Sequence, residues 1–172
     1  MVPSSYDAFL TATATAAAAL IGLLFVAVSV RDETIFGAKA TAGGEALAIT
    51  AFSGLVNSFV VSLLGLIPGT NLGVAATVMA VVSIVTIVRL HSRLHWARSS
   101  LVLLIAVVAY LVQLGYGIAQ LVNPHRQEVE SLAYVLFGTL IVSLQRAWTL
   151  LKGRQVAPPA DEPSAAPEAG PA

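Results

Sequence analysis

Apolar residues run through this chain in long stretches that carry no charge. Residues 8–30, 46–88 and 99–122 contain no Asp, Glu, Lys or Arg. A helix needs about 20 apolar residues to cross the hydrocarbon core of a bilayer, so each stretch is long enough for at least one span. The second stretch is far too long for one span, and Pro68-Gly69-Thr70-Asn71 marks a turn inside it.

This pattern predicts an all-α membrane protein, a bundle of five transmembrane helices. The expected spans are residues 8–30, 46–67, 72–90, 99–122 and 131–151, within a transmembrane domain of residues 1–154. The fifth span is the weakest because it contains Arg146, but that residue lies near its end, where a long side chain can reach the headgroups. Residues 155–172 are rich in Pro, Ala and acidic residues and are expected to form a disordered cytoplasmic tail.

Basic residues divide unequally between the two sides of this bundle. With five spans, eight of the nine Lys and Arg residues fall on one side and only Arg126 falls on the other. With four spans and the last segment on the surface, the division is five against four. Because basic residues in short loops favour the cytoplasm, we expect five spans, with the N-terminus outside and the C-terminus cytoplasmic. The first segment lacks the positive start of a signal peptide and is expected to be retained.

Six of these basic residues are expected to contact lipid headgroups at the cytoplasmic surface. They are Arg31, Arg89, Arg93, Arg98, Arg146 and Lys152.

Composition agrees with a lipid environment. Of the 172 residues, 57% are hydrophobic and 10% are charged, and the mean hydropathy is +0.85. Soluble domains carry about 25% charged residues, so a water-soluble fold of this chain could not cover its surface. The absence of cysteine excludes disulfides and thiolate metal sites, and a formal net charge of zero gives no support for a nucleic-acid partner.

Polar side chains inside the spans are the best candidates for function. A buried amide without a partner costs roughly 4–8 kcal/mol on a cyclohexane scale, so these groups must face protein or water. Tyr110, Gln113 and Gln120 share one face of the fourth span, and the second and fifth spans offer partners. We expect a polar seam of Ser53, Asn57, Tyr110, Gln113, Gln120, Thr139 and Ser143. Such a seam is either a set of interhelical hydrogen bonds or the lining of a wet cavity or permeation path.

Small residues also follow helical spacing in the first three spans. The stripes are Ala8, Thr11, Thr15, Ala18 or Ala19, and Gly22 in the first, Gly54, Ser58, Ser62 and Gly65 in the second, and Gly73, Ala76, Ala80 and Ser83 in the third. Faces of this kind let two helix backbones approach closely. They either hold one monomer together or form an interface between copies.

The spans offer little for catalysis or metal binding. None contains a mid-membrane ionisable residue, which counts against an ion-coupled transporter. None contains a histidine to activate a serine, or a pair of acids, so no enzyme is expected. His91 and His95 are spaced for one helix face, but Arg89 and Arg93 beside them oppose a cation. We therefore expect no metal and no other cofactor.

The start of the chain carries a resemblance. Tyr6-Asp7-Ala8-Phe9-Leu10, followed by the apolar segment 19–31, resembles the opening of small uncharacterised bacterial multi-pass integral membrane proteins. The resemblance is confined mainly to the first span. It implies a bacterial inner membrane setting and no particular activity.

These observations favour a non-enzymatic structural or accessory subunit in the lipid bilayer, acting through helix packing with itself or with a membrane-protein partner. The alternative is a small oligomeric channel or transporter with a polar path along the second, fourth and fifth spans. A third, weaker hypothesis is an envelope sensor whose acidic tail recruits a cytosolic protein. The first two differ in the polar seam, which is buried and hydrogen-bonded in a structural subunit and lined by water in a channel.

Overall fold

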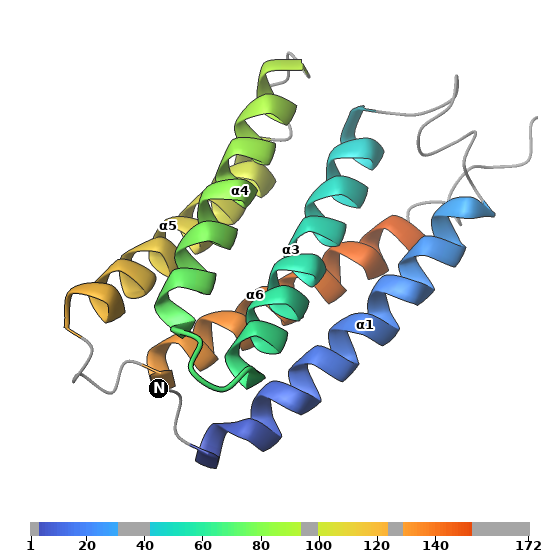
Figure 1. Cartoon of the computed structure of the whole chain (residues 1–172). Coiled ribbons are helices and arrows are strands. Elements are labelled where there is room, and N and C mark those ends of the chain that lie inside the picture. Colours follow the sequence, from blue (N-terminus) through green and yellow to red (C-terminus); the bar gives the residue numbers. More distant parts are fainter. Residues whose placement is uncertain (1–3, 31–41, 94–99, 124–128, 153–172) are drawn as a thin grey trace, which may run out of the picture.

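A computed structural model describes residues 4–30, 42–93, 100–123 and 129–152. A short 3-10 helix, Ser4–Tyr6, precedes five α-helices that pack side by side (Figure 1). The helices are α1 (Asp7–Ser29), α3 (Ala42–Leu66), α4 (Leu72–Arg93), α5 (Ser100–Val122) and α6 (Val129–Lys152). Each contains a segment long and apolar enough to cross a membrane. The expected all-α bundle of five candidate spans is therefore confirmed, while the predicted tail lies outside the described residues.

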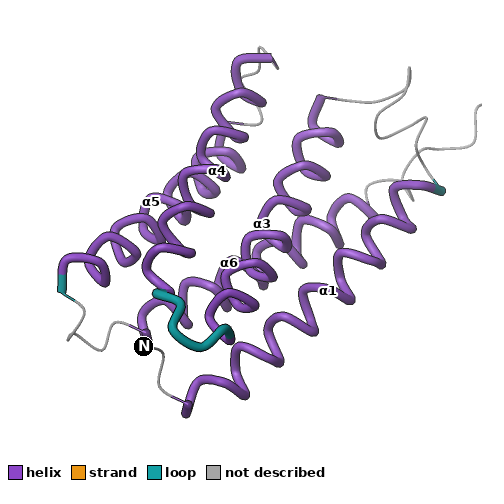
Figure 2. Tube along the Cα trace, viewed as in Figure 1, coloured by secondary structure: helices purple, strands orange, loops and turns teal. Residues whose placement is uncertain are grey.

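The turn between α3 and α4 lies where the sequence predicts it (Figure 2). Gly69 has a φ of +84°, a left-handed conformation that glycine adopts without steric cost. The Asn71 side-chain oxygen then accepts a hydrogen bond from the backbone N–H of Gly73 at 2.9 Å, which caps the start of α4. The turn thus reverses the chain within a few residues and makes α3 and α4 an antiparallel pair.

Helix α3 is the centre of the bundle. It packs extensively against α1 and α6 and also contacts α4, whereas α5 packs mainly against α4 and makes only slight contacts with α6 (Figure 1). The bundle is therefore held together mainly by the pairs α4–α5, α1–α3, α3–α6 and α3–α4.

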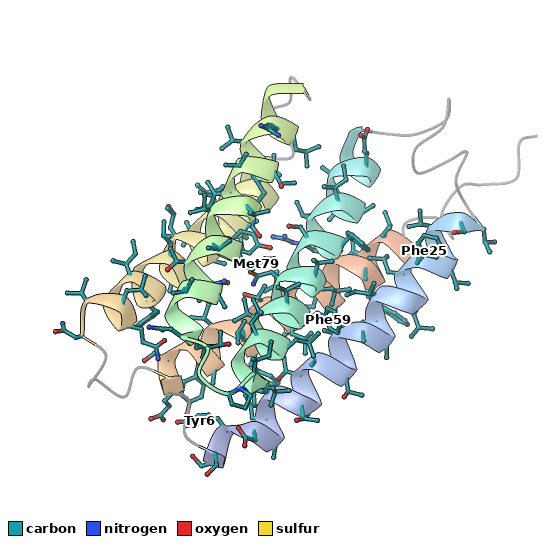
Figure 3. All side chains as sticks on the ribbon, viewed as in Figure 1. Tyr6, Phe25, Phe59 and Met79 are labelled. Carbon is teal, nitrogen blue, oxygen red and sulfur yellow. The ribbon has the colours of Figure 1, made fainter. Side chains whose placement is uncertain are left out.

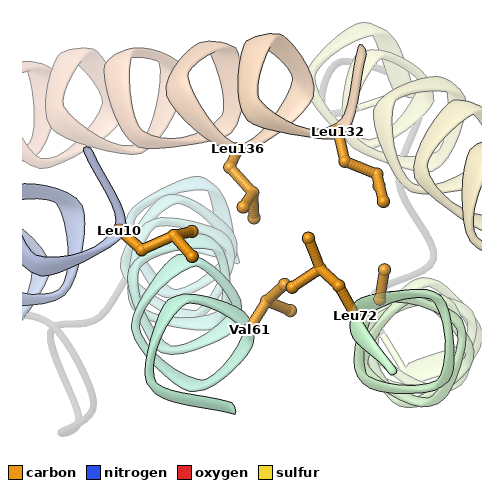
Figure 4. Close-up of a cluster of buried hydrophobic side chains, with 6 residues drawn as sticks. Leu10, Val61, Leu72, Leu132 and Leu136 are labelled. Atoms are coloured by element: carbon orange, nitrogen blue, oxygen red, sulfur yellow. The ribbon is translucent and has the colours of Figure 1, made fainter. Parts of the chain in front are cut away.

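One apolar cluster closes the end of the bundle near the α3–α4 turn. Its buried side chains come from four helices and point towards one another (Figure 4). They are Leu10, Val61, Leu72, Ala76, Leu132 and Leu136. Met79 of α4 and Tyr6 pack against the edge of this cluster (Figure 3). Two further clusters follow towards the opposite end, so apolar packing continues along the bundle.

The outer surface is apolar, as expected for helices surrounded by lipid. Leu23 and Phe25 of α1 are each 67% exposed, and side chains of the same kind project from the other helices (Figure 3). A water-soluble protein rarely exposes a continuous apolar surface of this extent.

The three stripes of small residues fall on different sides of their helices. Those of α3 and α4 are wholly buried, but every member of the α1 stripe from Ala8 to Gly22 is exposed. Helix α1 packs through another face, with Leu10, Ala17 and Leu24 against α3 and α6. Close packing inside the monomer therefore uses two of the three stripes and leaves the third facing outwards.

Candidate functional site

A pair of amides joins three helices in the middle of the bundle. The Asn57 side-chain amide on α3 donates to the Gln113 side-chain oxygen on α5 at 2.9 Å, and Gln113 donates back to Asn57 at 3.0 Å. Gln113 also donates to the backbone oxygen of Ala76 on α4 at 3.1 Å. Both side chains are completely buried. The two amides therefore satisfy each other and connect α3, α4 and α5.

The burial and mutual hydrogen bonding of this amide pair stabilise the fold. A neutral hydrogen bond contributes about 1 kcal/mol net, but a buried group that loses its partner costs about 1–3 kcal/mol. Replacing Gln113 alone would strand the side-chain amide of Asn57. The pair therefore specifies how the three helices are aligned, because a rotation or slip of one helix would leave several buried groups without partners.

Tyr110 lies one turn from Gln113 on α5 and adds a hydroxyl group to the same interior. Its ring is 3% exposed, and its hydroxyl interacts with the side chains of Ser53 on α3 and Ser83 on α4. Arg146 of α6 is an electrostatic neighbour of this hydroxyl. The interior polar cluster, which we define as Ser53, Asn57, Ser83, Tyr110, Gln113 and Arg146, therefore includes residues of four helices.

Helices α4 and α5 approach most closely beside this cluster. A Cβ atom on Gly73 would lie 2.8 Å from the backbone oxygen of Gly117, and one on Gly117 would lie 3.0 Å from the backbone nitrogen of Thr77. Gln120, one turn along α5, is 9% exposed. Its side-chain oxygen and the hydroxyl of Thr77 are buried without a hydrogen-bond partner among the described residues.

The predicted members on α6 meet α3 rather than the amide pair. Thr139 donates its hydroxyl to the carbonyl of Val135 in its own helix at 2.8 Å. Ser143 packs against Gly54 so closely that a Cβ atom on the glycine would collide with the serine hydroxyl. The predicted seam is therefore divided into an α3–α4–α5 part, which contains Asn57 and Gln113, and an α3–α6 part.

Sequence reasoning missed the contribution of α4. The carbonyl of Ala76 and the hydroxyl of Ser83 belong to the interior polar cluster or bond to it. Both residues belong to the stripe of small residues in the third span. That stripe is the feature of the sequence that could have indicated a contribution from α4. A backbone carbonyl, however, has no sequence signature.

Arg146 differs from the other residues expected at the headgroups. It is only 9% exposed, and its electrostatic neighbour is the hydroxyl of Tyr110 in the interior polar cluster. Side chains on a helix lean towards its N-terminus, which for α6 directs Arg146 back into the bundle. Arg89 is exposed near the end of α4. Arg93 and Lys152 lie in the last turns of α4 and α6, but their side chains, like Arg31 and Arg98, fall outside the described part.

A cavity of about 270 Å³ opens between α5 and α6. Its walls are apolar, with Ile105, Ala109 and Val112 from α5 and Val135 and Val142 from α6. Tyr110, Thr139, Ser143 and Arg146 also line it and provide its polar groups. The cavity therefore reaches the interior polar cluster from the side of the bundle.

The described residues contain no group of three His, Asp or Glu side chains that could hold a metal ion. The side chains of His91 and His95 lie outside the described part. Comparison with known proteins gives no match to a family model, to a curated protein or to a solved structure.

Proposed function

We propose that this multi-pass membrane protein is a non-enzymatic structural or accessory subunit that acts through helix packing with copies of itself or with a membrane-protein partner. The observation that carries the proposal is the reciprocal hydrogen bonding of Asn57 and Gln113, both completely buried. A permeation path needs polar groups that face water. The amides best suited to line one are bonded to each other inside the bundle.

The remaining interior polarity supports the same proposal. Arg146 is the only buried charged side chain in the described part of the chain, and the hydroxyl of Tyr110 is an electrostatic neighbour of its guanidinium group. General acid–base or nucleophilic chemistry needs a partner such as a histidine or a second acid within hydrogen-bonding distance.

We infer a bacterial inner membrane setting, with the N-terminus outside and the C-terminus in the cytoplasm. The division of eight basic residues against one supports the orientation, and the resemblance of the first span supports the setting. Reporter domains fused after Asn71 and after Arg154 test the orientation. We expect them on opposite sides of the membrane, and detection on the same side would contradict the five-span topology.

The outward stripe of α1 is the surface on which helix packing with a partner is expected. It runs over Ala8, Thr11, Thr15 and Gly22, and small residues at this spacing allow a second helix to approach closely. A Cβ atom on Gly22 would meet nothing within 4 Å, so Gly22→Leu blocks this surface without disturbing the monomer. Gly115→Leu, at an equally open position on α5, is the matched control.

Mass measurement of the detergent-solubilised protein tests this role of α1. We expect the wild type and Gly115→Leu to form a defined oligomer, and Gly22→Leu to shift the population towards the monomer. Equal oligomer fractions in all three proteins would exclude the α1 stripe from the interface between copies.

A channel or transporter is the second candidate, and one observation favours it. The side-chain oxygens of Thr77 and Gln120 are buried without partners among the described residues, and water in a path beside α4 and α5 would supply partners for them. If the polar groups line such a path, the double variant Asn57→Leu, Gln113→Leu folds normally and loses flux in reconstituted vesicles. If they are structural, the variant loses thermal stability instead.

Stability measurements on the single variants make this test sharper. Each single Leu substitution strands one amide, so we expect each to destabilise the protein by about 1–3 kcal/mol. Because the double variant strands neither amide, its loss should be clearly smaller than the sum of the two single losses. Additive losses would show that the two amides act independently and would remove the main support for a structural role.

A further inference from the structure

We propose that the cavity between α5 and α6 binds an anionic phospholipid of the surrounding bilayer, with the phosphate at Arg146 and one acyl chain along the apolar walls. This site is separate from the packing surface of α1 and does not depend on the oligomeric role proposed above.

The walls of the cavity fit a hydrocarbon chain. Valines and an isoleucine line its sides, and Ala106, Ala109 and Gly138 leave room between them. A Cβ atom on Gly138 would meet nothing within 4 Å, so the missing side chain keeps the cavity open. Ile105, Val112 and Gly138 line the cavity and are exposed on the outer surface of the bundle, so the cavity is open to surrounding lipid.

Arg146 gives the cavity a charge preference. Its side chain is 9% exposed and lines the cavity together with Tyr110. A guanidinium group stays charged in proteins, and it forms paired hydrogen bonds with phosphate more readily than an ammonium group does. Tyr110, whose hydroxyl is an electrostatic neighbour of Arg146, lines the cavity beside it. A lipid with a net negative headgroup complements this charge, whereas the choline of a zwitterionic lipid would place a second cation near Arg146.

The depth of Arg146 in the membrane agrees with this arrangement. Trp148 lies two residues further along α6 and is 58% exposed, as is typical of tryptophan at the interface between headgroups and hydrocarbon. From Arg146 to Val135 at the far end of the cavity, α6 rises about 16 Å. One leaflet of the hydrocarbon core is about 15 Å thick, so a chain whose phosphate lies at Arg146 would follow the cavity to the bilayer centre.

Native mass spectrometry with two lipids of identical acyl chains tests the proposal. The full-length protein is purified in detergent and incubated with phosphatidylglycerol or with phosphatidylcholine. We expect phosphatidylglycerol to be retained preferentially by the wild type, and Arg146→Gln to reduce its retention roughly tenfold, as loss of one charge-assisted hydrogen bond implies. Equal retention of the two lipids by the wild type would overturn the proposal.

A second pair of variants covers the case in which Arg146→Gln fails to fold. Gly138→Leu fills the cavity with an apolar side chain, and Gly115→Leu adds the same side chain at an open position outside the cavity. We expect only Gly138→Leu to lose phosphatidylglycerol. Identical retention by both variants would overturn the site. Binding of inorganic phosphate as tightly as phosphatidylglycerol would also overturn it, since that would show that the acyl chain contributes nothing.

Discussion

Helix α5 packs closely against α4 and only slightly against α6, and these two sides are built differently. Towards α4, the backbones touch at Gly73 and Gly117, and Gln113 donates to the carbonyl of Ala76. Towards α6, the helices diverge around a cavity, and Gly138 faces open space. Both sides contain small residues, so glycine alone does not make helices pack tightly in lipid. Lipid tails solvate an apolar surface as well as another helix does, so apolar contact alone does not hold two helices together. The closely packed side of α5 combines glycine with hydrogen bonds between helices.

The largest effect should come from adding a side chain at the α4–α5 contact. In Gly117→Leu, the new Cβ atom would lie 2.5 Å from the Thr77 hydroxyl and 3.0 Å from the Thr77 backbone nitrogen. Overpacking typically costs 1–3 kcal/mol when side chains can adjust, and a backbone atom can adjust far less, so we expect a loss of about 3 kcal/mol or more. The yield of monodisperse protein and its thermal unfolding midpoint measure this loss. A midpoint equal to that of Gly115→Leu would show that α4 and α5 are not held together here.

An intermediate effect is expected where α3 meets α6. In Gly54→Ala, the added methyl group would collide with the hydroxyl of Ser143, a side chain that can rotate away. We therefore expect a loss of about 1–2 kcal/mol, within the usual range for overpacking. Adding Ser143→Gly removes the obstructing side chain and should restore most of the thermal unfolding midpoint. If the second substitution lowers the midpoint further, the close contact between these residues does not determine stability.

The smallest effect should come from the open side of α5. Gly138→Leu places a side chain where nothing lies within 4 Å, so we expect the free energy of unfolding to change by no more than about 0.5 kcal/mol. Thermal unfolding in detergent without added phospholipid measures this change. A loss as large as that of Gly117→Leu would mean that α5 and α6 close upon each other in the folded protein, and the contrast between the two sides of α5 would disappear.

The apolar stretches and the Pro68–Asn71 turn were sufficient to predict the five helices, because chain length and hydropathy alone determine them. They were not sufficient to predict which face of each helix is inside. In α1, Leu10 is buried and Leu23 is 67% exposed, although both are leucines in the same span. Lipid and protein interior are both apolar, so hydrophobic periodicity, which distinguishes the inner and outer faces of soluble helices, carries little information here.

Polar residues were more informative, though not completely so. The high cost of an unpaired amide in hydrocarbon indicated that Asn57 and Gln113 needed partners, and the structure brings them together. The part played by Ala76 could not be predicted, because the acceptor is a backbone carbonyl. The position of Arg146 depends on the direction in which its side chain leaves the helix. Contact of Arg146 with lipid headgroups, expected from its place near the end of a span, stays a prediction.

The separation of the amide pair along the chain has a consequence for biosynthesis. Asn57 and Gln113 are 56 residues apart, and α4 lies between them. At about 5–20 residues per second, the ribosome needs roughly 3–11 s to produce the second amide after the first. Asn57 therefore leaves the ribosome several seconds before Gln113, and during that interval it lacks its final partner. A chain that ends before α5 would leave the amide of Asn57 without this partner, so the α3 helix reaches its final hydrogen bonding only after α5 has been made.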